Sequence, residues 1–341
     1  MALHRESLVL DLHIDTLLWA RMLGYDMGKH HRNRVPSSPF AWHLDLPRAA
    51  DGVLDCAVMG LVINPREINS ELMLPLKLLA WVERKRGVDQ TLATLDVLES
   101  AAERHSDRLV FARSGGDVRR AHAEGKFAAL TCLEGAHGIE GSLDHVRSAH
   151  ARGLRMFGIV HFQANEAGYP MTVKEFDDRG LTPFGRELIA ELDRLRIVVD
   201  LAHLNERGVD DALGAMTRPF VVSHTACRSL YDRSRNLTDD QIRRIADAGG
   251  VIGIAAGREF VGRGGVERFA DHIEHVIRVG GPGAAALGSD FDGLIVPIPG
   301  FADVSAFPRV TQELLGRGHS PEVIRQVLGE NGLRVLTEVC G

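Results

Sequence analysis

Short apolar segments alternate with longer amphipathic segments along almost the whole chain, and this alternation constrains the fold more than any other feature of the sequence. Strands that alternate with helices predict βαβ units and therefore a parallel sheet. Eight strands are predicted, at residues 7–13, 54–63, 128–134, 155–161, 197–203, 219–224, 250–255 and 284–290. Eight such strands favour a closed (β/α)8 TIM barrel over an open doubly wound sheet, and no dinucleotide-binding GxGxxG motif follows the first strand.

Polar residues mark the predicted starts of three helices. Thr182 precedes Pro183, which predicts an N-cap followed by proline at the first helical position. Thr238 with Gln241 three residues later predicts a capping box and a helix that continues to residue 248. Ser320 is predicted to open the last helix, whose apolar residues follow with helical spacing.

The connection between the second and third predicted strands is long. It spans residues 64–126, and helices are predicted within it at residues 74–84 and 90–104. We interpret this segment as an elaborated connection of the barrel and not as a separate domain. The chain is therefore predicted to be a single domain over residues 1–341, a length that α/β barrels reach as one domain.

Composition narrows the class of protein further. The chain has 341 residues, of which 45% are hydrophobic and 25% charged, as is usual for a soluble globular enzyme. The net charge of −6 argues against nucleic acid and anionic membranes as partners. No signal peptide and no apolar segment of about 20 residues is found, and the four cysteines are dispersed, so reduced thiols and a cytoplasmic location are expected. A homodimer is compatible with this composition.

Metal-competent side chains fall at the ends of six of the eight predicted strands. In chain order they are His13 and Asp15, Glu134, His161, His203, His224 and Asp290. The C-terminal ends of the strands of a (β/α)8 barrel meet on one face, which is where these barrels place their active sites. The sequence therefore predicts a metal-dependent hydrolase whose site lies at that end of the barrel.

The spacing and chemistry of these residues favour two neighbouring divalent ions. His13 and Asp15 lie two residues apart, so they are expected on one face of a strand, with Asp11 one step deeper. Imidazole and carboxylate groups suit zinc and similar ions. The two oxygens of Glu134 can bridge two metals roughly 3.5–4 Å apart.

Each residue taken alone has a simpler explanation. A single histidine at a strand end is more often a hydrogen-bonded structural residue than a metal ligand. Glu134 alone could serve a salt bridge, and Asp292 could support the site or form a turn. Chance does not readily place all of these residues at strand ends, which favours the joint hypothesis.

The ordered set of motifs resembles the membrane dipeptidase (renal dipeptidase) family of zinc peptidases, in the amidohydrolase-like superfamily. The segments that carry the resemblance are residues 11–17, 133–137, 199–203, 223–226, 235–236, 288–293 and 329–331. They extend over nearly the whole chain. The resemblance implies a zinc dipeptidase with two Zn²⁺ ions per chain: His13 and Asp15 would bind one ion, His203 and His224 the other, and Glu134 would bridge them.

The resemblance also implies roles at the substrate. His161 would contact the substrate near its scissile carbonyl, and Arg235 would hold its carboxylate. Asp290 would transfer protons during attack by a metal-bridging hydroxide. The implied substrates are free dipeptides, including those with a C-terminal D-residue.

Departures from the family pattern bear on the substrate. Ile14 stands where many relatives have asparagine, and residues 56–60 lack aromatic side chains. Another small amide or ester, such as an N-acyl amino acid or a lactone, is therefore an alternative substrate for the same metal site. A non-catalytic barrel is a third hypothesis, but Asp290 and His161 argue against it because a structural metal site has no use for a proton shuttle.

Overall fold

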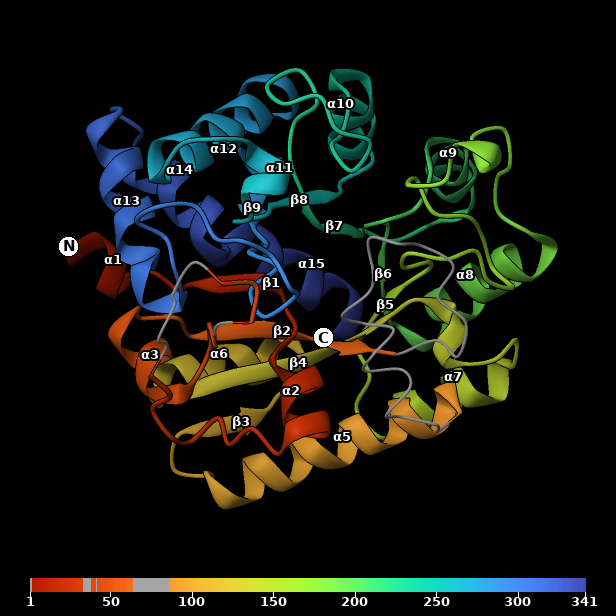
Figure 1. The fold of residues 1–341 in the computed structure, drawn as a ribbon, viewed down its shortest axis with the longest axis horizontal. Coiled ribbons are helices and arrows are strands. Elements are labelled where there is room, and N and C mark those ends of the chain that lie inside the picture. The colour runs from red at the N-terminus through yellow and green to blue at the C-terminus, as the bar shows by residue number, and fades with distance from the viewer. Residues whose placement is uncertain (1, 33–37, 41, 64–85) are drawn as a thin grey trace.

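A closed ring of parallel strands forms the centre of the molecule (Figure 1). The structure is a computed structural model that describes residues 2–32, 38–40, 42–63 and 86–341. In this described part the ring consists of β1 (Leu10–Ile14), β2 (Cys56–Val62), β4 (Phe127–Glu134), β5 (Met156–Gly158), β6 (Val198–Asp200), β7 (Val221–Thr225), β8 (Val251–Ile254) and β9 (Ala285–Leu287). The strands pair in the order β2-β1-β9-β8-β7-β6-β5-β4, and β2 pairs with β4 to close the ring. The predicted (β/α)8 TIM barrel is confirmed.

A short additional strand, β3 (Leu109–Phe111), was not predicted. It pairs with the first residues of β4, from Phe127 to Ala129, whereas β5 pairs with the last ones, from Cys132 to Glu134. β3 therefore extends the sheet only at the N-terminal end of the barrel. Three residues are too few to show the alternation by which a strand is recognised in a sequence.

Helices cover the outside of the ring (Figure 1). The described helices are α1 (Ala2–Glu6), α2 (Thr16–Leu23), α3 (Leu46–Asp51), α5 (Gly87–Arg104), α6 (Gly115–Ala123), α7 (Leu143–Ala151), α8 (Pro183–Leu195), α9 (Glu206–Ala215), α10 (Asp239–Asp247), α11 (Arg258–Val261), α12 (Val266–Gly280), α13 (Phe307–Gly316), α14 (Pro321–Arg325) and α15 (Asn331–Cys340). The predicted caps are confirmed: Thr182 accepts a hydrogen bond from the Gly185 amide, and Thr238 forms a capping box with Gln241. The helix predicted at 74–84 lies outside the described residues.

The last predicted helix is interrupted. A π-helical turn at Gln326–Glu330 separates α14 from α15. Within that turn a Cβ atom on Gly329 would lie 2.4 Å from the carbonyl oxygen of Leu8, so the turn fits closely against the backbone that leads into β1. α15 then packs on β1, β6, β8 and β9 and covers the N-terminal end of the barrel.

The strands carry two separate buried layers. Residues such as Leu10, Leu130 and Val198 belong to a cluster that continues into α15 at the N-terminal end. Their neighbours along the strands, such as Ala129 and Val199, pack in a larger cluster with the surrounding helices. This apolar filling leaves the C-terminal end of the ring for polar side chains.

Candidate active site and metal centre

Glu134, the last residue of β4, lies at the centre of a buried polar cluster at the C-terminal end of the barrel. Its Oε1 atom is close to the Nε2 atoms of four imidazoles: His203 at 3.1 Å, His161 at 3.5 Å, His13 at 3.6 Å and His224 at 3.7 Å. All four rings are buried. The structure thus brings together predicted site residues from the ends of five different strands.

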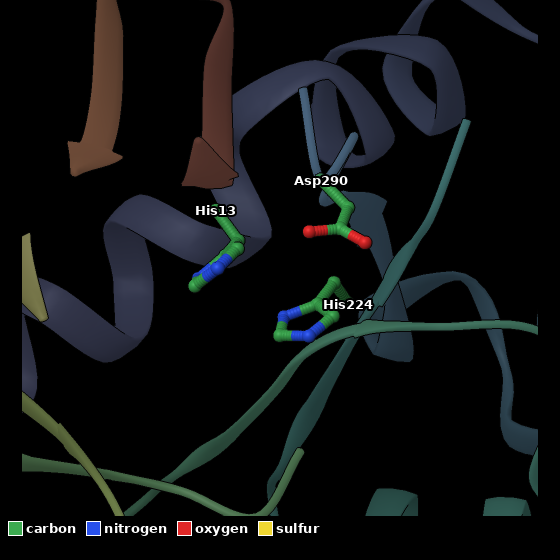
Figure 2. Close-up of side chains that lie close together, drawn as sticks. All are labelled: His13, His224 and Asp290. Carbon is green, nitrogen blue, oxygen red and sulfur yellow. The ribbon is translucent and has the colours of Figure 1, made fainter. Parts of the chain in front are cut away.

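Two further carboxylates complete the cluster. Asp15 Oδ1 lies 3.1 Å from His13 Nε2, and Asp290 follows β9. Figure 2 shows Asp290, His13 and His224 turned toward one common space. Three sets of potential ligand atoms lie within 4.8 Å of one another: His13 with Asp15 and Glu134, Glu134 with His161 and His203, and His13 with His224 and Asp290.

His161 lies in the cluster, as its place at a predicted strand end indicated. The family resemblance implied a substrate contact for it, and its Nε2 atom lies about as near to Glu134 Oε1 as that of His13. Its ring packs edge-on against His203, with centroids 4.7 Å apart. His161 therefore lines the same cluster as the predicted ligands.

The strand that carries His13 is not regular, which corrects the predicted spacing argument. β1 pairs with β2 at Asp11 and Ala57 and again at Ile14 and Met59, so one extra residue is inserted in β1. This β-bulge breaks the simple alternation of side chains, and Asp15 lies beyond the end of the strand. His13 and Asp15 do meet, but through a bulge and a turn and not through shared strand parity.

A second bulge carries His224. β7 pairs with β8 at Val222 and again at Thr225, where β8 has advanced by only two residues, from Ile252 to Ile254. At this bulge the Ser223 carbonyl oxygen lies so close to the residue after β9 that a Cβ atom on Gly288 would lie 1.8 Å from it. Bulges near active sites re-aim side chains, and here both turn an imidazole toward the cluster.

Backbone strain is concentrated at the same place. His203 and Asp290 have φ angles of 67° and 62°, in the left-handed region that residues with a side chain rarely adopt. Asp292 also has a positive φ, and its carboxylate accepts hydrogen bonds from Thr16 Oγ1 at 2.5 Å and from the His43 amide at 2.7 Å. Such strain persists only where the surroundings hold it, and it gathers at functional sites.

His43 and Thr16 are residues that sequence reasoning missed. They hold Asp292, and thereby the strained segment that contains Asp290, against the start of α2. His43 lies neither at a predicted strand end nor in a motif that carries the family resemblance, whereas Thr16 lies in the motif at residues 11–17 but had no role assigned to it. Their contacts with Asp292 can be recognised only in the folded chain, because 249 residues separate His43 from Asp292.

The ionisation of the cluster fits a bound cation. Burial and the negative charge of Asp15 raise the pKa of Glu134 to about 8, and the same causes raise the pKa of Asp290 well above its usual value. Burial lowers the pKa of His203 and His224 well below the usual value, so these rings are neutral, which is the form that binds metals. A divalent ion would supply the positive charge that the buried carboxylates need in order to ionise.

Unsatisfied atoms support the same conclusion. Glu134 Oε2, His13 Nε2 and Asp15 Oδ1 face the cluster, are buried and make no hydrogen bond within the described part of the chain. A buried polar atom without a partner costs about 1–3 kcal/mol, so each such atom calls for an explanation. Imidazole and carboxylate donors in this number suit divalent ions such as zinc.

A cavity of about 690 Å³ opens above the cluster. Its floor includes Asp15, Glu134 and Asp290, and its walls are largely apolar, with Leu18, Val62, Phe162, Val173, Phe260, Leu294 and Ile295 among them. A few convergent polar groups below apolar walls are typical of a site for a small molecule.

Arg235 lines this cavity, as expected of a group that binds substrate. Its Nη2 atom lies 3.1 Å from His203 Nε2, and its guanidinium lies over the ring of Phe260 at 5.3 Å. Burial lowers the pKa of Arg235 to about 10, so it remains a cation at neutral pH. A nearby acid on the chain, Asp239, pairs with His275 at 2.7 Å and not with Arg235. The guanidinium is therefore available to an anion in the cavity.

A sequence profile described as membrane dipeptidase (peptidase family M19) matches residues 1–340. The chain belongs to this family.

Individual relatives agree with this assignment. Dipeptidase tcpJ of Claviceps purpurea (strain 20.1) is 30% identical over 328 residues, which cover 94% of this chain and 75% of the relative. A metallopeptidase of Rhodobacter sphaeroides, solved with a phosphinate mimic of the dipeptide L-Ala-D-Ala, is 26% identical and superposes with a TM-score of 0.84 over 98% of this chain and 99% of its own. A solved M19 dipeptidase, described as dipeptidase AC, is 27% identical with the same TM-score and the same coverage.

None of the described helices is both long enough and apolar enough to cross a bilayer.

Proposed function

We propose that this M19 protein is a zinc-dependent dipeptidase that hydrolyses the peptide bond of free dipeptides, with two Zn²⁺ ions bound per chain in a single (β/α)8 domain of residues 1–341. The observation that carries the proposal is the position of Glu134 among four buried, metal-competent imidazoles, directly below a cavity that also contains Arg235. The dipeptide mimic bound to the Rhodobacter relative supports the substrate class.

Five residues would hold the metal ions. His13 and Asp15 would bind one ion, His203 and His224 would bind the other, and Glu134 would contact both. When bound, such ions polarise a substrate carbonyl and lower the pKa of a water toward roughly 7.

The remaining residues would act on the substrate. Arg235 would bind its carboxylate through paired hydrogen bonds, which fixes the scissile bond over the cluster. His161, whose pKa burial lowers well below the usual value, would be neutral and would donate an N–H to the carbonyl oxygen as negative charge develops there. Asp290 would accept a proton from the attacking water and deliver it to the leaving amine.

The alternative substrate class is another small amide or ester, such as an N-acyl amino acid or a lactone. The apolar walls of the cavity suit an acyl chain as well as an amino acid side chain. Arg235 discriminates among these substrates, because a lactone has no free carboxylate for a guanidinium to bind.

Metal content tests the proposed centre. Because two ligand pairs share one glutamate, the fully loaded protein is expected to contain about two zinc ions per chain after dialysis. Chelation should abolish dipeptide hydrolysis, and added zinc should restore it in proportion to the ions bound. Elemental analysis together with activity measures both, and full activity at a reproducible content near one ion per chain would refute the two-metal centre.

A further inference from the structure

Asp200, the last residue of β6, is buried beside the bulge that carries His224. Its Oδ1 atom accepts hydrogen bonds from the amides of Ala202 at 3.0 Å and Ser223 at 2.9 Å. Its Oδ2 atom accepts the hydroxyl of Ser223 at 2.5 Å. The same Ser223 Oγ atom lies 2.9 Å from His224 Nδ1. A continuous line of contacts therefore runs from the carboxylate through the hydroxyl to the imidazole.

The direction of these hydrogen bonds follows from counting protons. An ionised aspartate can only accept, and a serine hydroxyl has one proton to donate. Because that proton goes to Asp200, Ser223 Oγ can only accept from His224, so Nδ1 of His224 must carry a proton. A neutral imidazole has one N–H, which leaves Nε2 of His224 with a free lone pair.

The lone pair faces the proposed metal centre. His224 Nε2 lies 2.8 Å from His203 Nε2. Arg235 can only donate, and its Nη2 atom is 3.1 Å from His203 Nε2, so that nitrogen also presents a lone pair. Two lone pairs at this distance repel each other unless a cation binds both.

We propose that Asp200 and Ser223 form a relay that fixes His224 in its Nδ1–H tautomer and so reserves Nε2 for the metal. The inference rests on the proposed metal centre and goes beyond it, because neither residue touches the substrate or the ion. Both are positioning residues. A hydrogen-bonded partner on the second nitrogen of a metal-binding histidine typically changes metal affinity 10–100-fold.

An asparagine at position 200 would invert the relay. In Asp200→Asn the amide oxygen keeps the two backbone N–H donors, so the new NH₂ group must face Ser223 and donate to its Oγ. The Ser223 hydroxyl is then free to donate to His224 Nδ1, which forces the proton onto Nε2, the nitrogen that should bind metal. Ser223→Ala only removes the relay and leaves both tautomers accessible.

Zinc affinity, measured by competition with a chromophoric chelator, separates this relay from a merely structural role. The four proteins to compare are the unmodified protein, Asp200→Asn, Ser223→Ala and the double variant. Asp200→Asn is expected to weaken one of the two zinc sites 10–100-fold, and Ser223→Ala to weaken it less. The double variant Asp200→Asn/Ser223→Ala should regain the affinity of Ser223→Ala, since no hydroxyl remains to donate to His224. A purely structural role predicts the opposite order, with the double variant at least as weak as Asp200→Asn, and that result would overturn the relay.

Cys132→Ser is the matched control. Cys132 Sγ lies 4.0 Å from Asp200 Oδ2, but it is not part of the hydrogen-bonded path from Asp200 to His224. This variant is expected to bind zinc within about twofold of the unmodified protein. A loss as large as that of Asp200→Asn would mean that any disturbance around Asp200 weakens the site, and the relay would be rejected.

A spectroscopic readout on the unmodified protein does not depend on the folding of any variant. In metal-free protein with ¹⁵N-labelled histidine, NMR is expected to report His224 as the Nδ1–H tautomer. An Nε2–H tautomer would overturn the relay whatever the variants do. An Nδ1–H tautomer of His224 in a protein that binds no zinc would instead contradict the proposed function, so the two failures are distinguishable.

Discussion

Asp290→Asn is expected to lower kcat by roughly 10²–10⁴-fold while zinc content stays at the level of the unmodified protein. Asp290 is buried at the floor of the cavity, with its amide bonded to the carbonyl of His13, so its carboxylate is fixed beside the metal-binding cluster. Asparagine keeps the shape of the side chain but cannot accept and return a proton. The expected loss corresponds to about 3–5.5 kcal/mol of transition-state stabilisation.

Steady-state kinetics and elemental analysis on the same preparation check this prediction. Near-normal turnover with both metals retained would move the proton transfer to another group, and Asp292 is the next carboxylate on the segment. Loss of zinc would instead make Asp290 a metal ligand, which its proximity to His13 and His224 also allows.

Arg235→Ala is expected to lower kcat/KM for a free dipeptide by at least ten- to 150-fold. A charged, partly buried hydrogen bond contributes about 1.5–3 kcal/mol, which corresponds to that range. The same variant should lose little on a dipeptide amidated at its C-terminus, because that substrate has no carboxylate to bind. Arg235→Lys should not restore the rate, since an ammonium group cannot form the paired hydrogen bonds of a guanidinium.

Arg233→Ala is the matched control for this experiment. Arg233 also lines the cavity but is exposed there, with its guanidinium 4.7 Å from the ring of Tyr231. Its removal is expected to change the rate on the free dipeptide less than about threefold, within the effect of an exposed charge. If Arg233→Ala and Arg235→Ala lost activity equally, the loop would attract the substrate by its overall charge, and a specific carboxylate clamp would be excluded.

The barrel could be predicted from the sequence because its strands are short apolar segments that alternate with longer amphipathic ones. Each predicted strand has a counterpart in the ring, although several are shorter than predicted, such as β5 at Met156–Gly158. Most of the site could be predicted for a related reason: in a parallel barrel the ends of all strands meet, so position at a strand end already implies proximity.

What could not be predicted depends on contacts between distant segments. A bulge is visible only as a shift in pairing, so nothing in the sequence indicates that His13 and His224 each lie beside an inserted residue. The hydrogen bond from Ser223 to Asp200 joins two strands. The hydrogen bond from the His43 amide to Asp292 joins distant parts of the chain. β3 is a three-residue strand that local alternation cannot reveal.

The most direct test of the dipeptidase assignment compares two substrates with the unmodified, zinc-loaded protein. A free dipeptide and the same dipeptide amidated at its C-terminus differ only in the carboxylate that Arg235 would bind. We expect the kcat/KM of the free dipeptide to be at least about tenfold higher than that of the amide, because the free dipeptide gains one charged hydrogen bond. Equal rates on the two substrates, or no hydrolysis of any free dipeptide in a set of L,L and L,D pairs, would contradict that assignment.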